Sequence, residues 1–192
     1  MSINALDPAK TALLVMDLQA DIVARFADGS AALLERTATL IAAARAAHVP
    51  VIYVVVGFRP GYPEVSPRNQ SFSAIAGTGR FTTQPPGADI VPAVRPQPED
   101  VIIVKHRVGA FSGTDLDMIL RAKGVDTLVL TGLATSGVVL STVRAGADAD
   151  YRLFVVADCC GDGDDEVHRV LTEKVFVRQA SVVRAGELAF QK

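Results

Sequence analysis

Polar and charged residues follow three of the apolar runs in this chain, at the points where the runs end. Asp17 and Gln19 follow the first run, Lys105 follows "VIIV", and the polar turn "TGLATSGVVLST" of residues 131–142 follows a third. A carboxylate and an ammonium brought together shift each other's proton affinity, as acid–base chemistry requires. We therefore interpret Asp17 and Lys105 as candidate catalytic residues, against the alternatives of a turn-forming aspartate and a solvated lysine.

Six short and almost wholly apolar runs are typical of strands that are covered on both faces. The runs are Thr11–Gln19, Val49–Phe58, Asp100–His106, Val125–Gly132, Tyr151–Cys160 and, more weakly, Ala180–Ala185. Helical patterns separate them, at Ser30–His48, Thr114–Gly124, about Ser136–Asp148 and about Asp164–Val177. Ser30 and Thr114 are the expected N-caps of the first two helices, and Gly124 is the expected C-cap of the second.

Strands that alternate with helices predict parallel pairing through right-handed crossovers. We expect an α/β fold, a three-layer α/β/α sandwich with a mostly parallel six-stranded sheet, in a single domain of residues 1–192. Ligands of such sheets bind outside the carboxyl ends of the strands. We therefore expect Asp17, Lys105, the Thr135–Val138 turn and Asp158 to converge on one edge. Arg107, two residues after Lys105, could bind a substrate carboxylate or form a surface ion pair.

Composition narrows the class of partner. The formal net charge is −2 with Lys and Arg scattered along the chain, which argues against nucleic acid and anionic membranes and favours a small molecule. No apolar run approaches the roughly 18–20 residues of a membrane span, and the N-terminus "MSINALDPAK" lacks a secretory pattern. The adjacent Cys159 and Cys160 close no useful loop as a disulfide. We expect a soluble protein of the reducing cytoplasm.

Residues 59–98 are rich in Pro, Gly, Ser and Gln, which predicts a long excursion over the surface. Gln70, Arg80 and Phe81 are candidates to close over the pocket from this excursion.

Three motifs, in this order, resemble the signatures of the isochorismatase-like hydrolase family: "MDLQ" at the first strand end, "KHRVGAF" at 105–111 and "TGLATSGVVLST". The stretch "ADCCGDGDDEVHRVL" extends the resemblance over nearly the whole chain. In most of that family a cysteine nucleophile opens the helix, with the aspartate as its base and the lysine as an electrostatic partner. Here the cysteine position falls on Val138, which cannot attack a substrate. The resemblance also implies a non-proline cis bond at Gly137–Val138.

Isochorismatase itself lacks that cysteine and resembles this chain in a Lys-x-Arg-x-[SG]-Ala-Phe run, matched here from Lys105 through Arg107 to Phe111. Its aspartate donates a proton to a vinyl ether, a role that Asp17 could take. Burial would favour the protonated carboxyl and Lys105 would oppose it. The departures at "GLATSGVV" and Val108 predict a substrate other than isochorismate. The expected oxyanion- or substrate-binding residues are Gln19, Arg107, Phe111, Thr135, Ser136 and Gly137.

Three functions remain open from the residues and the resemblance. The first is a small-molecule hydrolase that uses Asp17 and Lys105 without a cysteine nucleophile, in acid-assisted cleavage of an ether- or amide-like bond. The second is a catalytically decayed member that binds a ligand or a partner. The third is an amidase with a nucleophile displaced to Cys159 or Cys160, and Ser136 beside Lys105 is a further candidate nucleophile.

We expect no cofactor and no metal. Metal-binding nicotinamidases of the family carry an Asp-x-His pair after the second strand, where this chain reads "VVVGFRPGY". His48, His106 and His168 are therefore expected to be structural. The family resemblance and the apolar helical faces predict a homo-oligomer.

Overall fold

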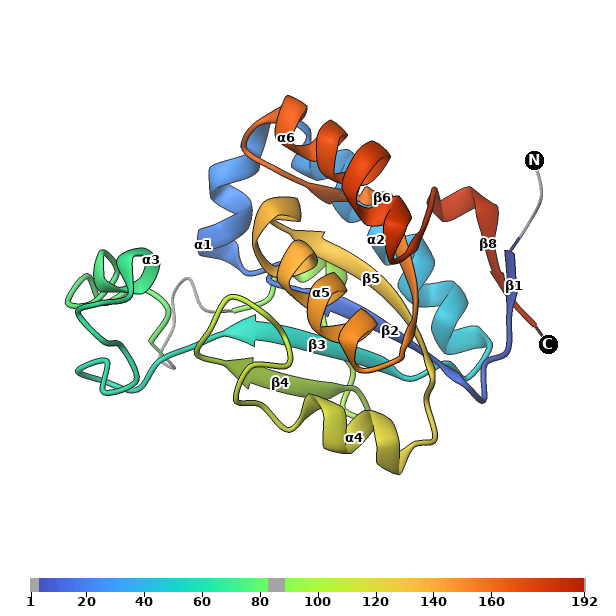
Figure 1. Ribbon diagram of the computed structural model, residues 1–192, viewed down its shortest axis with the longest axis horizontal. Helices are drawn as coiled ribbons and strands as arrows, with labels where there is room; N and C mark the ends of the chain where they lie inside the picture. Colours follow the sequence, from blue (N-terminus) through green and yellow to red (C-terminus); the bar gives the residue numbers. More distant parts are fainter. Residues whose placement is uncertain (1–3, 83–88, 192) are drawn as a thin grey trace.

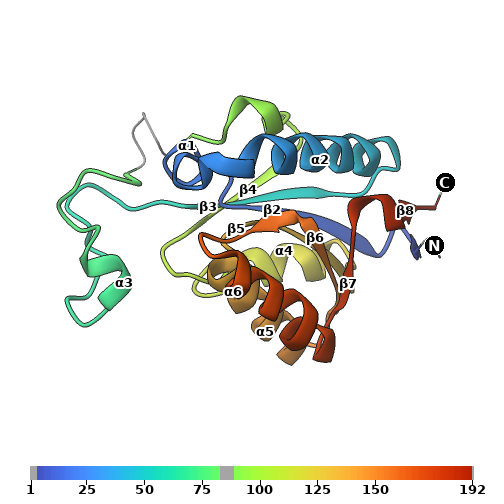
Figure 2. The ribbon, with the colours of Figure 1, turned by 90° about the horizontal axis from the view of Figure 1, so that it is seen from above.

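A six-stranded parallel sheet forms the centre of the molecule and lies between two layers of helices (Figures 1 and 2). The computed structural model describes residues 4–82 and 89–191. The strand order is β4-β3-β2-β5-β6-β7, with every neighbouring pair parallel. The strands are β2 (Thr11–Met16), β3 (Val51–Val56), β4 (Val101–Lys105), β5 (Thr127–Leu133), β6 (Arg152–Gly161) and β7 (Ser181–Val183). The predicted three-layer α/β/α fold is therefore confirmed.

Helices from different parts of the chain cover the two faces of the sheet (Figure 2). The short α1 (Ala20–Val23) and the long α2 (Ala27–Ala46) lie on one face. The other face carries α4 (Leu116–Ala122), α5 (Leu140–Asp148) and α6 (Asp165–Val170). α6 continues through a π-helical turn, Leu171–Val175, and a 3₁₀ turn, Phe176–Arg178.

Alternate side chains of the central strands enter two separate apolar clusters, one on each face. In β2, Leu14 and Met16 belong to the cluster beneath α4 and α5, whereas Leu13 and Val15 belong to the cluster beneath α2. Because side chains of a strand alternate between the two faces, a strand buried on both sides must be apolar throughout. This explains the continuous apolar runs of the sequence.

The helix ends match the sequence prediction in part. The C-cap of α4 is Lys123, and the predicted C-cap Gly124 follows it with a left-handed φ of 68°. Asp164 caps α6 through its side chain. The N-cap of α4 is Asp115, although the Thr114 hydroxyl accepts a hydrogen bond from the backbone at 3.4 Å. α2 begins at Ala27, ahead of the predicted cap at Ser30.

One small sheet was not predicted. β1 (Asn4–Leu6) pairs in parallel with β8 (Leu188–Phe190), which joins the two ends of the described chain beside the start of β2 (Figure 1). Each strand has only three residues, too few to show the alternation that indicates a strand.

The segment after β3 extends away from the sheet, as the predicted surface excursion requires (Figures 1 and 2). It contains the short α3 (Gln70–Ser73) and a small cluster of its own in which Phe58, Tyr62, Phe72 and Phe81 are buried. The segment returns to the strand ends through an isolated bridge between Gln19 and Ile90. We call residues 57–82 and 89–90 of this segment the arm. The arm is anchored at the carboxyl edge of the sheet by this bridge.

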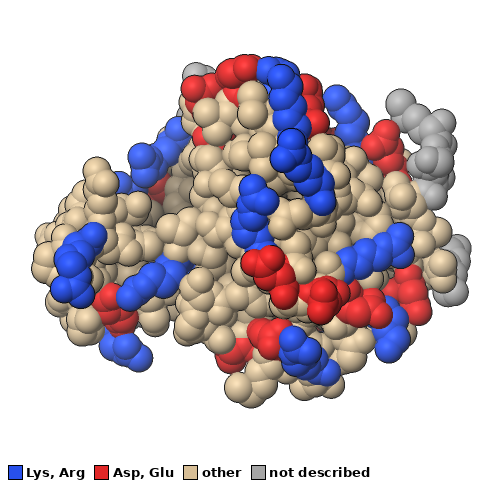
Figure 3. Space-filling model, in the orientation of Figure 1, with Lys and Arg blue, Asp and Glu red and all other residues tan. Residues whose placement is uncertain are grey.

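Charge is distributed without a large patch of one sign on the face shown in Figure 3, where Lys and Arg are interspersed with Asp and Glu. Among the described residues, no helix is both long enough and apolar enough to cross a bilayer.

Candidate active site

Asp17 and Lys105 form a buried ion pair at the carboxyl edge of the sheet. Lys105 is the last residue of β4, and Asp17 directly follows β2. Their strands flank β3, so the two side chains meet across its end. The Lys105 Nζ lies 2.8 Å from the Asp17 Oδ2, and the side chains are only 3% and 8% exposed. The structure therefore brings together the two residues that the sequence analysis interpreted as candidates for acid–base chemistry.

The Asp17 carboxyl has a raised pKa and two oxygens in different surroundings. Burial raises its pKa above the ordinary aspartate value, and the charge of Lys105 opposes that rise without cancelling it. Oδ2 is bonded to Lys105, whereas the buried Oδ1 has no hydrogen-bond partner among the residues described. Lys105 also donates to the Arg107 carbonyl oxygen at 3.1 Å. One carboxyl oxygen is thus fixed by the ammonium, and the other is available to a proton.

Two backbones approach closely where β5 passes the end of β2, next to Asp17 in the chain. Met16 is paired with Gly132, whose φ is 135°. A Cβ at this glycine would lie 2.0 Å from the Met16 carbonyl oxygen, so no larger residue fits. Asp17 itself has φ of 57°, and its N–H donates to the Val54 carbonyl at 2.8 Å. Glycine is therefore required where β5 passes the end of β2.

The turn opens the α5 helix with a π-helical segment, Thr135–Val139. Its cis peptide bond is Leu133–Ala134, so the expectation of a cis bond at Gly137–Val138 is wrong. Gly137 instead departs from helical geometry through its φ of −96° and ψ of −106°. Gly137 therefore marks a kink within this helical segment.

Val138 is buried in the apolar cluster that also contains Met16 and Ala110. Ile103 belongs to the same cluster, and Lys105 follows it at the two-residue spacing that puts both side chains on one face of β4. Val138 and the ammonium therefore lie on the same side of the sheet. An aliphatic side chain at this position offers neither a nucleophile nor a proton.

Two backbone donors of the turn already have acceptors. The Ser136 N–H donates to the Asp162 carboxylate at 2.6 Å, and the Gly137 N–H donates to the Ala134 carbonyl at 3.0 Å. Both residues were predicted to bind an oxyanion or substrate, and that role would require these bonds to be exchanged. Thr135 is fully buried, and its hydroxyl is 2.8 Å from Nδ1 of His168.

The remaining predicted binding residues also have partners within the protein. The Gln19 amide donates to the Val56 carbonyl at 3.0 Å and accepts from the Val56 N–H at 2.8 Å. The exposed Arg107 donates to the backbone carbonyls of His106 and Glu64. Phe111 stacks on Tyr151, with ring centroids 5.8 Å apart. These contacts give each residue a structural task, and their roles toward a substrate stay predictions.

Asp158 does not join the ion pair. Its Oδ2 lies 3.6 Å from Arg36 on α2, and its Oδ1 accepts from the Ala185 N–H at 2.9 Å. The cause is an irregularity in β6, where Val155 is paired with Leu130 but Cys160 with Gly132. The extra β6 residues bulge out of register and take Asp158 with them. The expected convergence therefore holds for β2 and β4 but not for Asp158.

The two cysteines are poor candidates for a displaced nucleophile. Cys159 belongs to the apolar cluster beneath α2, and Cys160 belongs to the cluster on the opposite face. Burial raises the pKa of Cys159 to about 11 and also raises the pKa of Cys160. Because the thiolate is the reactive form, these buried thiols are held in the unreactive state.

The residues proposed to close over the pocket belong to the arm. Phe81 is buried in the arm's own cluster, and Arg80 lies over its ring and 3.4 Å from Asp21. Gln70 begins α3 and is exposed. Residues 83–88 of the excursion lie outside the described part of the chain. A lid function for these side chains stays a prediction.

Of the three histidines, His168 holds a position that the sequence did not reveal. His106 contacts the Gly57 carbonyl through Nδ1 at 2.5 Å, and His48 follows the end of α2. His168 instead reaches the turn through Thr135, and only the tertiary fold joins these two residues. Within residues 4–82 and 89–191, no group of three or more His, Cys, Asp or Glu side chains is placed to hold a metal ion.

Comparison with known proteins identifies relatives that match most of this chain. The isochorismatase domain family matches residues 11–187. Ureidoacrylate amidohydrolase RutB from Methylobacterium radiotolerans is 35% identical, over 96% of this chain and 81% of its own length. The crystal structure of N-carbamoylsarcosine amidase from Thermoplasma acidophilum superposes with a TM-score of 0.76 at 29% identity, covering 92% of this chain and 96% of that protein.

A second solved structure supports the fold alone. A cysteine hydrolase from Pseudomonas syringae pv. phaseolicola 1448A superposes with a TM-score of 0.89 at 24% identity, over 97% of this chain and 94% of that protein.

Proposed function

Because this chain belongs to the isochorismatase family of hydrolases, we propose that it hydrolyses a small molecule with Asp17 and Lys105 and without a cysteine nucleophile. The observation that carries the proposal is the buried pair itself. The Asp17 Oδ2 is 2.8 Å from the ammonium, while Oδ1 is buried without a partner among the described residues. Such an arrangement suits a carboxylic acid that donates its proton inside the site.

The proposed reaction is acid-assisted cleavage of an ether- or amide-like bond. Protonated Asp17 donates its proton to the substrate as the bond to the leaving group breaks, and water adds to the electrophilic carbon. Lys105 stabilises the carboxylate that remains. The proton lost by the attacking water returns to Asp17, so the enzyme ends in its starting state. A pKa raised by burial keeps more of the carboxyl in the donating form.

The surroundings of the pair favour this route over a covalent one. Val138 supplies no nucleophile, and burial keeps the thiols of Cys159 and Cys160 protonated. The N–H groups of Ser136 and Gly137 are bonded within the protein, which leaves less of the turn available to stabilise an oxyanion. Proton donation asks for neither a thiolate nor these donors.

The relatives suggest the bond type. Ureidoacrylate amidohydrolase and N-carbamoylsarcosine amidase are named for amide-like substrates that carry a carboxylate. We propose a small polar acid with an ether-, amide- or carbamate-like bond as the substrate. Arg107, exposed after the end of β4, is the proposed carboxylate partner.

We further propose that the chain acts in the cytoplasm as a homo-oligomer. Ile102 and Val104 lie on the edge strand β4 and are 50% and 43% exposed, which leaves apolar surface at the edge of the sheet. Light scattering of the purified protein tests this, and a monomeric mass at micromolar concentration would contradict it.

The experiment is a turnover panel of vinyl ethers, amides and carbamates. Wild type, Asp17→Asn and the control Asp148→Asn are compared, since Asp148 is exposed at the end of α5. We expect turnover of at least one substrate by wild type and by the control, and a loss of about 10²–10⁴-fold in Asp17→Asn. Equal activity in wild type and Asp17→Asn would refute the mechanism.

Restoring sulfur discriminates the catalytically decayed alternative. Val138→Cys places a thiol at the start of the helix, where the backbone dipoles favour the thiolate. Amidase activity that appears in this variant and disappears on alkylation would mean that Asp17, Lys105 and the turn still form a competent site. No turnover by wild type and none by Val138→Cys would favour a protein that binds a ligand or a partner.

A further inference from the structure

The turn that opens α5 is held from outside by the connection between β6 and α6. The Asp162 carboxylate accepts the Ser136 N–H at 2.6 Å. The second contact joins side chains, Nδ1 of His168 and the Thr135 hydroxyl at 2.8 Å. Thr135 is fully buried, so water cannot replace this partner. The two contacts fix consecutive residues of the turn.

The contact with Thr135 depends on the protonation state of the imidazole. A neutral imidazole with its proton on the other nitrogen accepts the threonine O–H at Nδ1, whereas the charged ring has only donors. The contact therefore reverses direction when His168 is protonated, and the Thr135 hydroxyl has to turn. Burial lowers the pKa of His168, with Asp162 and Asp165 opposing, which favours the neutral ring near pH 7.

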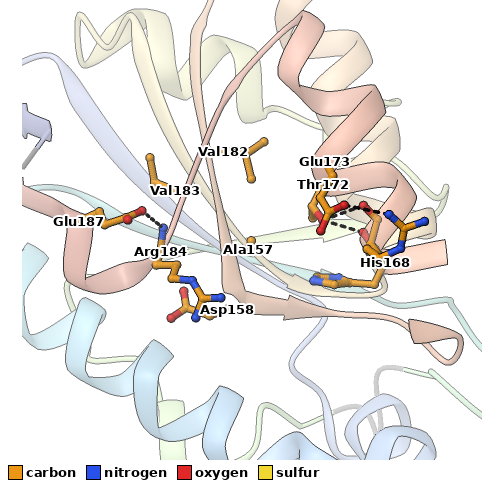
Figure 4. A pocket seen from close by; sticks show the side chains of 10 residues that line it. Ala157, Asp158, His168, Thr172, Glu173, Val182, Val183, Arg184 and Glu187 are labelled. Carbon is orange, nitrogen blue, oxygen red and sulfur yellow. Dashed lines mark hydrogen bonds and ion pairs between the residues drawn. The ribbon is translucent and has the colours of Figure 1, made fainter. Parts of the chain in front are cut away.

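His168 lies between the turn and a cavity of about 390 Å³ beside β7. Figure 4 shows its ring extending from the helix toward β6, where Ala157 forms part of the wall. The charged groups around the ring and the cavity come from three parts of the fold, namely α6 with its flanking turns, β6 and the segment after β7. They are Asp162, Asp165, Arg169 and Glu173 from the first, Asp158 from the second, and Arg184 and Glu187 from the third. Protons and small solutes thus have a route to His168 from the side opposite the turn.

We propose that His168 is a positioning residue, which orients the turn of Thr135–Val139 through the Thr135 hydroxyl. The proposal builds on the proposed site, because that turn includes Val138, which shares an apolar cluster with Met16, the residue before Asp17. It adds a residue from α6 that touches neither Asp17 nor Lys105 in any contact of the described structure. Protonation of His168 changes the orientation of the turn, and with it the position of Val138 in the proposed site.

The test is nuclear magnetic resonance of the whole protein, which needs no substrate. ¹⁵N-labelled histidine reports the tautomer of each of the three rings, and backbone amides report the turn. We expect His168 to be neutral at pH 7 with Nδ1 as acceptor. The amide signals of Thr135, Ser136 and Gly137 should then titrate with the midpoint of His168, and this titration should vanish in His168→Asn. Turn amides that stay unchanged through that midpoint would overturn the proposal.

Variants in the Val138→Cys background give a second readout. We expect iodoacetamide to alkylate Cys at 138 several-fold more slowly at pH 7 in His168→Leu, because the helix start is no longer held in place. His168→Asn restores the rate, since the asparagine amide oxygen can accept from Thr135. His48→Asn is the matched control and leaves the rate unchanged. Equal rates in His168→Leu and its parent would refute the positioning role, whatever the native substrate proves to be.

Discussion

Replacing Lys105 with methionine removes the ammonium and leaves the Asp17 carboxyl buried with no counter-charge. At the 2.8 Å separation, an effective dielectric constant of about 20 gives an attraction of about 6 kcal/mol, and desolvation of both groups offsets much of it. Breaking a buried pair from one side costs about 3–5 kcal/mol. We therefore expect Lys105→Met to lower the free energy of unfolding by most of that amount at pH 8.

The loss should depend on pH, because Asp17 in the variant can avoid the penalty by binding a proton. Its folded pKa, already raised by burial, rises further once Lys105 is gone. A raised carboxyl pKa contributes stability at low pH that is lost as pH rises, at about 1.4 kcal/mol per pH unit, between the unfolded value near 3.9 and the folded pKa. The variant should therefore approach wild-type stability as pH falls toward the unfolded value near 3.9, and it should fall behind as pH rises above the folded pKa of Asp17 in the wild-type protein.

Urea unfolding of wild type, Lys105→Met, Asp17→Asn and the double variant measures the coupling at each pH. We expect the double variant to be more stable than Lys105→Met at pH 8, since it contains no buried charge at the pair. The control is Arg121→Met, because Arg121 and Asp117 are also 2.8 Å apart but are 64% and 44% exposed. Its expected cost is small, because solvent screens an exposed pair. A Lys105→Met cost below about 1 kcal/mol at every pH would refute the reasoning.

Three further outcomes follow from the site and its supports. Gly132→Ala should unfold the protein or cost more than about 3 kcal/mol, since its Cβ would lie 2.0 Å from a backbone oxygen of β2; Gly186→Ala, which meets nothing within 4 Å, should leave the melting temperature unchanged. Iodoacetamide should leave Cys159 and Cys160 unmodified in the native protein at pH 7.5 and alkylate both in urea, whereas rapid native alkylation with loss of activity would favour a displaced thiol. Thr142→Val should cost about 1–3 kcal/mol in urea unfolding, because it removes the hydroxyl that accepts a buried N–H at 3.2 Å, and an unchanged midpoint would contradict this.

The sheet and the ion pair were accessible from the sequence for a simple reason. Strands covered on both faces need apolar side chains at every position, so β2, β3 and β5 stand out as continuous runs. Parallel strands also share one carboxyl edge, so Asp17 and Lys105 could be expected at the same place without any knowledge of the strand order.

Other features depend on tertiary contacts that leave no local pattern. The bulge in β6 that moves Asp158 toward Arg36 arises from its register against β5. The bond between His168 and Thr135 joins residues from separate helical segments, and a lone histidine on a helix gives no sign of it. The cis bond at Leu133–Ala134 likewise has no signature in an apolar dipeptide. The strands and their carboxyl ends could therefore be predicted, whereas the contacts made with them by more distant segments could not.

The protonation of Asp17 tests the central claim most directly. Proteins carrying ¹³C-labelled aspartate are titrated by nuclear magnetic resonance, with Asp17→Asn used to assign the Asp17 carboxyl signal. A midpoint clearly above the ordinary aspartate value of about 3.9 is predicted, with a still higher midpoint in Lys105→Met. A midpoint at or below 3.9 in the wild-type protein would contradict a buried proton donor at this position.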